Sequence, residues 1–220
     1  MKKILFKRYP GSFSRHPGGR QDPEAFKLNK KNLHLILIPF LVFLAGCVSV
    51  KSPNITEYTL NPHFKSIACR KTNKTIRLLP VNIVPQYSSL SFVYRLTDLN
   101  FTHDYYNAFF NKPNEQITQT LQTYLVKSKQ FKLVLDDSGY MPTDYNLYAK
   151  VIKLYADYRD RAHPKAVVAM NFKLFNKKQR LVLNKTFSSR IGLKTKTSCA
   201  LVVAWSQDLA DIYRSFLRSL

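Results

Sequence analysis

Three successive stretches with the periodicity of β-strands constrain the fold of this chain most. Residues 145–158 are rich in β-branched and aromatic side chains, and residues 168–174 alternate between apolar and other side chains. Residues 181–191 form a third such stretch. The polar segments 159–164 and 176–179 separate the three. Because strands joined by short polar loops pair with their sequence neighbours, the pattern predicts an antiparallel meander.

Two segments have the periodicity of amphipathic helices. The first follows Pro113, and we expect Asn114 to be its N-cap; its apolar face comprises Ile117, Leu121, Tyr124 and Leu125. The second ends the chain, with Ser198 as its expected N-cap and an apolar stripe of Val202, Trp205, Leu209, Ile212, Tyr213 and Phe216. Acids and bases both lie opposite that stripe, which favours packing on a sheet over contact with a membrane.

The remaining apolar segments predict shorter strands at residues 57–60, 76–84, 90–96 and 131–135. Pro80 places its strand near an edge or at a bulge, because proline cannot donate to a sheet. Residues 97–112 are interpreted as an aromatic loop. The expected fold is therefore a two-layer α+β domain: a mostly antiparallel sheet of about five or six strands with two amphipathic helices on one face.

A lipoprotein-type export signal precedes this domain. Lys30 and Lys31 stand before the apolar run 33–43, and the small residues 44–46 lead directly into Cys47. This order matches the lipobox of bacterial lipoproteins, in which the thiol of the cysteine is alkylated by lipid. The run is shorter than the ~20 residues of a membrane-spanning helix. A buried or membrane helix with an incidental cysteine is the alternative.

The signal divides the chain into three parts. We expect residues 1–46 to be a disordered N-terminus followed by the signal peptide, residues 47–56 a lipidated tether, and residues 57–220 the folded domain. Residues 1–27 are polar and show no helical or strand periodicity. Translation from Leu28 would give a signal peptide of ordinary length. Fatty chains such as palmitate on Cys47 would anchor the protein, and Val48, where an aspartate would favour retention at the inner membrane, indicates a periplasm-facing site at the outer membrane.

The charge of the chain is strongly basic. The formal net charge is +22, and residues 1–46 hold only nine basic and two acidic side chains. Most of the surplus therefore belongs to the exported part. It favours acidic partners such as lipid head groups or an acidic protein surface, and export argues against nucleic acid. A solvated basic surface without a dedicated ligand is the alternative.

Cys69 and Cys199 remain once Cys47 is assigned to lipid. The oxidising periplasm permits a disulfide between them. Two small buried side chains would be equally compatible with the sequence.

The sequence contains no catalytic constellation. His63, His103 and His163 are far apart in sequence, and none has a second metal ligand at helical spacing. Residues 136–137 are adjacent carboxylates before Ser-Gly, which indicates a turn. There is no glycine-rich phosphate loop and no nucleophile elbow. We expect no metal, no cofactor and no enzymatic activity, so the chain is interpreted as a binding protein.

One candidate interface lies on the long strand of residues 145–158. Tyrosine and basic side chains occur together there, and aromatic and basic groups together suit a protein interface. The candidate residues are Tyr145, Tyr148, Lys150, Tyr155 and Tyr158. Ordinary strand packing with solvated lysines is the alternative.

The order of these parts resembles the ABC-type transport auxiliary lipoprotein family, which includes paraquat-inducible protein C. After the lipobox come the Tyr-x-Leu of residues 58–60, the Ile-x-Leu-Leu-Pro-Val-Asn-Ile-Val-Pro of residues 76–85 and the Phe-Val-Tyr-Arg of residues 92–95. An aromatic segment then ends at Pro113 and leads into a helix and the Phe-Lys-Leu-Val of residues 131–134. The family tends to have tryptophan before that proline, whereas this chain has phenylalanine.

The resemblance implies a lipoprotein partner of an MCE-type lipid transporter, which combines an ABC permease and ATPase with a periplasmic MCE protein. It implies no catalytic residues, and lipid itself is a further candidate ligand. The alternative function is that of a structural or secretion-associated envelope lipoprotein, which would bind an anionic surface polymer or a protein partner.

Overall fold

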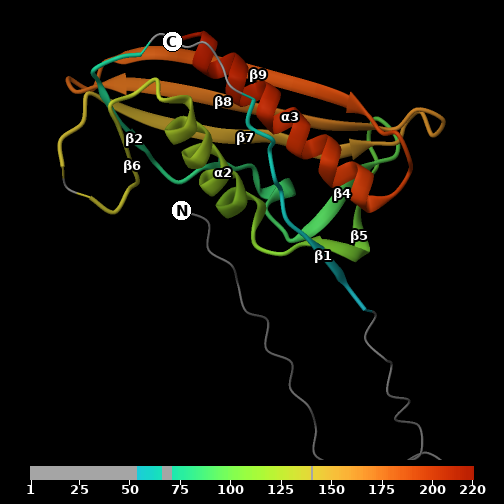
Figure 1. The fold of residues 1–220 in the computed structure, drawn as a ribbon. Helices are drawn as coiled ribbons and strands as arrows, with labels where there is room; N and C mark the ends of the chain where they lie inside the picture. Colours follow the sequence, from blue (N-terminus) through green and yellow to red (C-terminus); the bar gives the residue numbers. More distant parts are fainter. Residues whose placement is uncertain (1–53, 66–70, 140) are drawn as a thin grey trace, which may run out of the picture. The chain divides into compact units, whose positions relative to one another are not determined.

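The computed structural model describes residues 54–65, 71–139 and 141–220, which belong to one compact unit (Figure 1). In chain order, this part contains β1 (Thr56–Tyr58), β2 (Thr75–Leu78), β3 (Asn82–Ile83), the 3₁₀ turn η1 (Pro85–Tyr87), β4 (Ser91–Arg95), β5 (Phe101–Phe109), α2 (Pro113–Ser128), β6 (Leu133–Leu135), β7 (Tyr145–Asp157), β8 (Lys165–Asn176), β9 (Leu181–Gly192) and α3 (Ser198–Arg218).

The predicted meander is confirmed as β7, β8 and β9. β7 pairs antiparallel with β8 along its whole length, and β8 pairs antiparallel with β9. The turn between β8 and β9 is fixed by the Asn176 side chain, whose Oδ1 accepts hydrogen bonds from the amides of Lys178 and Arg180 at 2.9 and 3.1 Å. Gln179 adopts a positive φ of 57° there. This short polar connection sets the β8–β9 register.

The other edge of β7 pairs with three short parallel strands in succession: β2, β3 and β4. The sequence predicted one strand over residues 76–84, but the structure divides it at Pro80, between β2 and β3. Proline lacks the amide that would continue the ladder. Pro85 then begins η1, which separates β3 from β4. β2 also pairs with β6, β4 with β5, and β5 with β1.

The predicted aromatic loop over residues 97–112 is wrong, because most of it forms β5. This strand is antiparallel to β4 and parallel to β1. Most of its side chains are exposed, and only Ala108 and Phe109 are buried. Without one buried face the strand shows no apolar–polar alternation, so its sequence resembles a loop.

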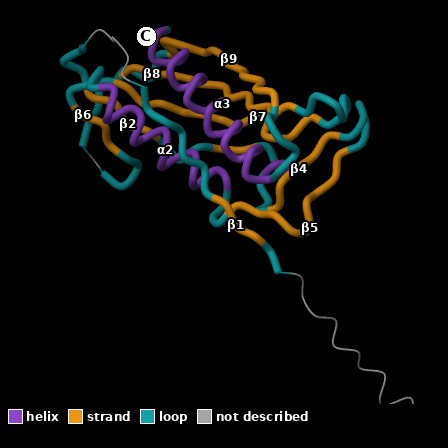
Figure 2. Tube along the Cα trace, turned by 45° about the vertical axis from the view of Figure 1, so that its right-hand side comes forward, coloured by secondary structure: helices purple, strands orange, loops and turns teal. Residues whose placement is uncertain are grey.

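α2 and α3 both cover the same face of the sheet (Figures 1 and 2). All six residues of the predicted stripe on α3 are buried. The Phe216 ring stacks on Phe172 of β8, with ring centroids 4.4 Å apart, and Tyr213 meets Tyr124 of α2 edge-on at 5.3 Å. Burying an aromatic side chain of this kind contributes about 1.5–3 kcal/mol, so the stripe accounts for the docking of α3.

The two predicted N-caps are each displaced toward the N-terminus. Thr197, not Ser198, caps α3, and its side-chain oxygen accepts a hydrogen bond from the Ala200 amide at 3.3 Å. Lys112, not Asn114, occupies the N-cap position of α2, because Pro113 takes the first helical position that its fixed φ favours.

The predicted two-layer α+β class is confirmed, with both helices on one face. The sheet has nine strands instead of about five or six: β5 was expected to be a loop, and the strand expected over residues 76–84 is divided into β2 and β3. The long strands β7, β8 and β9 pair antiparallel with one another, whereas the shorter strands β1, β2, β3, β4 and β6 make parallel pairings. No helix within the described residues has the length and apolar character needed to cross a membrane.

Candidate functional site: the open face of the sheet

The face of the sheet opposite the helices carries the candidate site, and we call it the open face. On β7 the side chains of Leu147, Ala149 and Val151 point toward the helices and are buried. Tyr148 and Lys150 alternate with them and therefore point to the open face. The register places Tyr148 beside Lys173 of β8 and Lys150 beside Asn171.

A shallow cavity of about 360 Å³ lies on the open face. The rings of Tyr148 and Phe175 meet edge-on across it, with centroids 5.4 Å apart. The Asn171 amide donates hydrogen bonds to the side chains of Asn184 and Thr186 on β9, at 3.0 and 3.1 Å. The cavity is lined by Asn82, Tyr148, Ala149, Lys150, Asn171, Lys173, Phe175 and Gln179. An aromatic floor beside two ammonium groups and several amides suits an anionic group with an apolar part.

Basic side chains dominate this part of the sheet. The three long strands and the β8–β9 turn carry Lys150, Lys153, Lys165, Lys173, Lys177, Lys178, Arg180, Lys185 and Arg190. Within the described residues, none of these nine forms an ion pair. Three acids border this region: Asp157 and Asp160 are paired with Arg159 and His163, and Asp144, which shares a pocket with Lys177, Lys178 and Arg180, is paired with Lys74. The register places Lys150, Lys153, Lys165, Lys173 and Arg190 on the open face, whereas Lys185 pairs with Phe172 and lies on the side of the helices. The open face therefore carries a surplus of positive charge.

The structure separates the five predicted interface residues. Tyr148 and Lys150 lie together at the cavity. Tyr145 is half-buried against the core and faces the helices, because three residues along a strand reverse the direction of the side chain. Tyr158 follows β7 and meets Tyr94 edge-on at 5.5 Å.

A β-bulge explains the position of Tyr155. The β7–β8 register shifts between Val151 and Lys153, so Tyr155 returns to the same face as Tyr148. Its side chain is nevertheless only 3% exposed, because Tyr87 of η1 stacks on it at 5.9 Å and Phe101 of β5 covers it edge-on at 5.7 Å. Tyr155 therefore belongs to the packing of the sheet.

The candidate interface also contains residues that the sequence prediction missed. Lys173, Asn171 and Phe175 occupy the open face of β8 and Gln179 follows in the turn. The alternation of β8 already separated Asn171 and Lys173 from the buried Met170 and Phe172. Only the register between β7 and β8 shows that they join Tyr148 and Lys150.

The Tyr94–Arg95 pair of the family pattern has a structural position beside this face. Arg95 forms an ion pair with Asp98 at 3.0 Å, and its guanidinium lies over the rings of Phe101 and Tyr155 at 5.5 and 6.0 Å. The Tyr94 hydroxyl donates to the Asp104 carboxylate, and burial raises the pKa of Tyr94. Both residues thus join β4 to β5 and β7.

Of the three cysteines predicted as sites, only Cys199 lies within the described residues. Cys47 and Cys69 lie outside the described residues, so lipidation and the disulfide stay predictions. Cys199 is exposed in the first turn of α3. Among the described residues, no cluster of three or more histidine, cysteine or carboxylate side chains could hold a metal ion.

Comparison with known proteins gives a likeness of fold. No family model matches the chain, and no curated protein matches it. The structure is similar to the protein XCC0632 of Xanthomonas campestris, described as DUF330, with a TM-score of 0.68 and 17% identity over 74% of this chain and 92% of that one. A crystal structure described only as an uncharacterized protein has a TM-score of 0.62 and 15% identity, over 76% and 98% of the two chains. This chain therefore has the fold of the DUF330 protein.

Proposed function

We propose that this chain is a non-enzymatic, lipid-anchored protein of the bacterial outer membrane that binds the MCE component of an ABC-type lipid transporter. The lipobox ending at Cys47 supports the anchor, and the order of sequence motifs supports the transporter. The likeness in fold to the DUF330 protein agrees with a shared architecture but carries no function by itself.

One observation carries the binding role: two lysines of the open face that form no ion pair within the described residues border an aromatic cavity. Lys150 and Lys173 flank the Tyr148 ring, and no acid of the described chain neutralises them. An acidic segment of a periplasmic partner, with an apolar side chain to fill the cavity, has the matching chemistry. Exposed single ion pairs are weak, at about 0–1 kcal/mol, so the aromatic contact has to supply most of the affinity.

Site-specific crosslinking tests this proposal in cells. A photoreactive amino acid at Tyr148 should capture the MCE protein, whereas the same group at Val203, which is exposed on α3, should not. Co-purification of the permease and ATPase with the captured protein would support the transporter. Capture of no MCE protein at Tyr148, in a strain that contains one, would contradict it.

Charge reversal adds a matched comparison. Lys150→Glu with Lys173→Glu should abolish the crosslink, because both changes repel an acidic partner. Lys127→Glu with Lys196→Glu changes the net charge equally at exposed positions away from the open face, and should leave the crosslink intact.

The basic open face also favours a second candidate function, binding of an anionic surface polymer by a structural or secretion-associated lipoprotein. In that case Tyr148 should capture cell-wall or secretion components, and binding should fall steeply with salt, because screening weakens exposed charges.

A further inference from the structure

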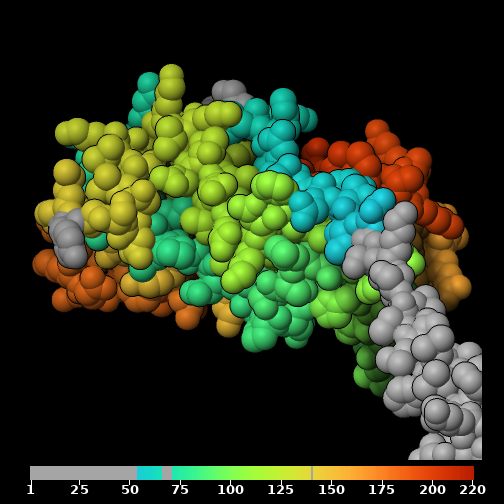
Figure 3. Space-filling view, turned by 90° about the horizontal axis from the view of Figure 1, so that it is seen from below, coloured from blue at the N-terminus to red at the C-terminus, as the bar shows by residue number. Residues whose placement is uncertain are grey.

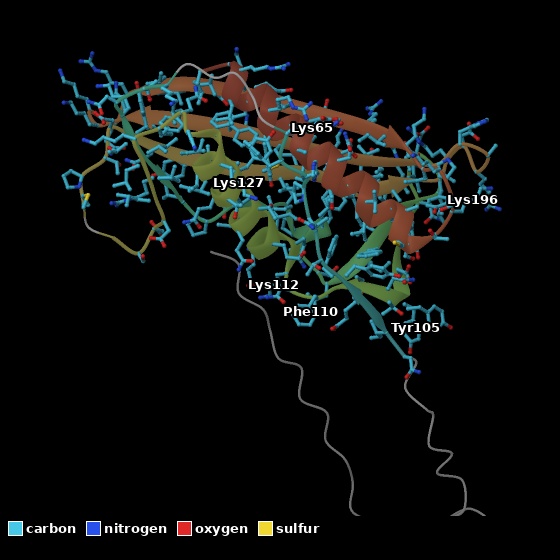
Figure 4. The ribbon with its side chains drawn as sticks, viewed as in Figure 1. Lys65, Tyr105, Phe110, Lys112, Lys127 and Lys196 are labelled. Atoms are coloured by element: carbon cyan, nitrogen blue, oxygen red, sulfur yellow. The ribbon has the colours of Figure 1, made fainter. Side chains whose placement is uncertain are left out.

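Exposed aromatic side chains gather where the described chain begins. Tyr105, Tyr106 and Phe110 are 67%, 60% and 62% exposed, and Ile55 is 56% exposed. β1 pairs with β5 through Thr56 and Asn107, so Ile55 lies next to Tyr106. Phe110 donates its amide to the Tyr58 carbonyl at the other end of β1. We call these four residues the tether rim, and Figure 4 shows Tyr105 and Phe110 along one border of the domain.

A bulge in β5 pushes two of these rings outward. Between the pairs Val93–His103 and Ser91–Ala108, β4 has one residue and β5 has four. The Asp104 carboxylate fixes the extra residues of β5, because it accepts hydrogen bonds from the amides of Tyr106 and Asn107 at 2.8 and 3.0 Å. The Tyr105 and Tyr106 rings support each other edge-on at 5.3 Å. The exposure of the two tyrosines is thus fixed by the backbone.

The tether rim is firmly joined to the rest of the domain. After β1, the Leu60 amide donates to the buried Gln116 side chain of α2 at 2.7 Å, and the Asn61 amide donates to Ser206 of α3 at 3.0 Å. Figure 3 shows residues 54–65 beside the segment of β5 and the start of α2. The tether rim is therefore held in a fixed position on the domain.

We propose that the tether rim rests in the interfacial zone of the bilayer that holds the lipidated Cys47. This inference depends on the anchor of the proposed function. Seven residues lie between Cys47 and Ile55. The eight Cα–Cα steps that join the two residues allow a reach of about 30 Å at most. The anchor keeps the rim at a high local concentration near the membrane, so even weak partitioning is effective.

The chemistry of the rim fits lipid better than an acidic protein. Tyrosine has an apolar ring and a polar hydroxyl, and is enriched where membrane meets water. Lys112 lies at the rim, but the exposed Glu57 and the Asp104 carboxylate offset it. The contact is therefore apolar, and neutral phosphatidylcholine should support it as well as an anionic mixture.

Depth-dependent quenching tests the proposal on the lipidated full chain. In a background with Cys69→Ser and Cys199→Ser, a fluorophore is attached to Tyr105→Cys or to Phe110→Cys. Val182→Cys, which replaces a residue 54% exposed on β9, serves as the matched control. The protein is reconstituted into phosphatidylcholine vesicles that contain a nitroxide-labelled lipid.

We expect the labels at positions 105 and 110 to lose fluorescence to the nitroxide lipid and the label at position 182 to keep it. If the protein binds the vesicles but all three labels stay unquenched, the contact of the tether rim with the bilayer is refuted and the anchor is left intact. Protein that does not float with vesicles would overturn both. Loss of fluorescence at positions 105 and 110 only after addition of the MCE protein would assign the rim to a protein partner instead.

Discussion

The indole Nε1 of Trp205 donates a hydrogen bond to the backbone carbonyl of Tyr155 at 3.3 Å. This carbonyl lies on the part of β7 between the residues that pair with β3 and those that pair with β4. The interruption by η1 leaves this edge of β7 without a strand partner, while the other edge pairs with β8, and α3 supplies a donor. The Trp205 side chain is fully buried and also contacts the rings of Phe92 and Phe109 at 5.1 and 5.5 Å.

Trp205→Phe should therefore destabilise the domain by about 1–3 kcal/mol, because it removes the hydrogen bond and leaves a void in the core. Trp205 is the only tryptophan, so urea unfolding has to be followed by circular dichroism. Tyr148→Phe, at the exposed cavity, is the control and should change the midpoint little. Equal midpoints for Trp205→Phe and the wild type would contradict the role of this contact.

The buried Asp208 should make the stability fall as the pH rises. The residue is 0% exposed on the inner side of α3, and burial, aided by the Asp211 carboxylate and opposed by Ser189, raises the pKa of Asp208 from 3.8 to about 7. Between these two values the folded state binds a proton that the unfolded state has released. Raising the pH in this window therefore favours unfolding, by up to about 1.4 kcal/mol per pH unit.

Asp208→Asn should remove this dependence. We expect the variant to match the wild type near pH 4 and to exceed it in free energy of unfolding at pH 8, as measured by urea unfolding at both pH values. A wild-type slope that persists in the variant would show that other groups cause it.

Asp104 should have the opposite dependence. Burial alone would raise the pKa of its carboxyl, but hydrogen bonds from Tyr94, the Tyr106 amide and Asn107 outweigh burial and lower the pKa. Its contribution is present at neutral pH and is lost as the pH falls below about 4. Asp104→Ala should cost about 1–3 kcal/mol at pH 7, because the Tyr94 hydroxyl and the bulge amides lose their acceptor. The cost relative to wild type should shrink on acidification, which thermal unfolding at pH 7 and pH 3 would reveal.

Cys47→Ala should leave the domain folded and remove it from the membrane fraction. The residue lies before the described domain, so its change should not affect the circular dichroism spectrum, while loss of the fatty chains removes the anchor. Cell fractionation measures the outcome, and Cys199→Ser, which changes another cysteine, should stay with membranes. Membrane retention of the Cys47→Ala protein would refute anchoring through this residue.

The parts of the fold that the sequence predicted share one property, a single buried face. The stripe of α3 and the alternation of β8 both follow from burial on one side, and both are confirmed. β5 has almost no buried face and was missed. The division of the strand at Pro80 was also missed, although the proline itself pointed to an irregularity.

The candidate site was predictable only in part for a related reason. Tyr148 and Lys150 could be found because they alternate with buried neighbours on one strand. The position of Tyr155 depends on the bulge at Val151 and on the cover by Tyr87, which is distant in sequence. Register shifts, and the burial of a side chain by residues distant in sequence, arise from tertiary packing, and no local sequence pattern predicts them.

The parallel strands on one edge of β7 have a consequence for how the chain is made. Ile76 pairs with Tyr145 and Tyr94 with Ala156, each across more than sixty residues, whereas β7, β8 and β9 are joined by short connections. Synthesis proceeds from the N-terminus, so β2, β3 and β4 emerge before the strand that completes them. Until β7 arrives, their backbone edges stay unsatisfied and prone to pair with other chains. The nascent protein should therefore depend on a holding chaperone until β7 has emerged.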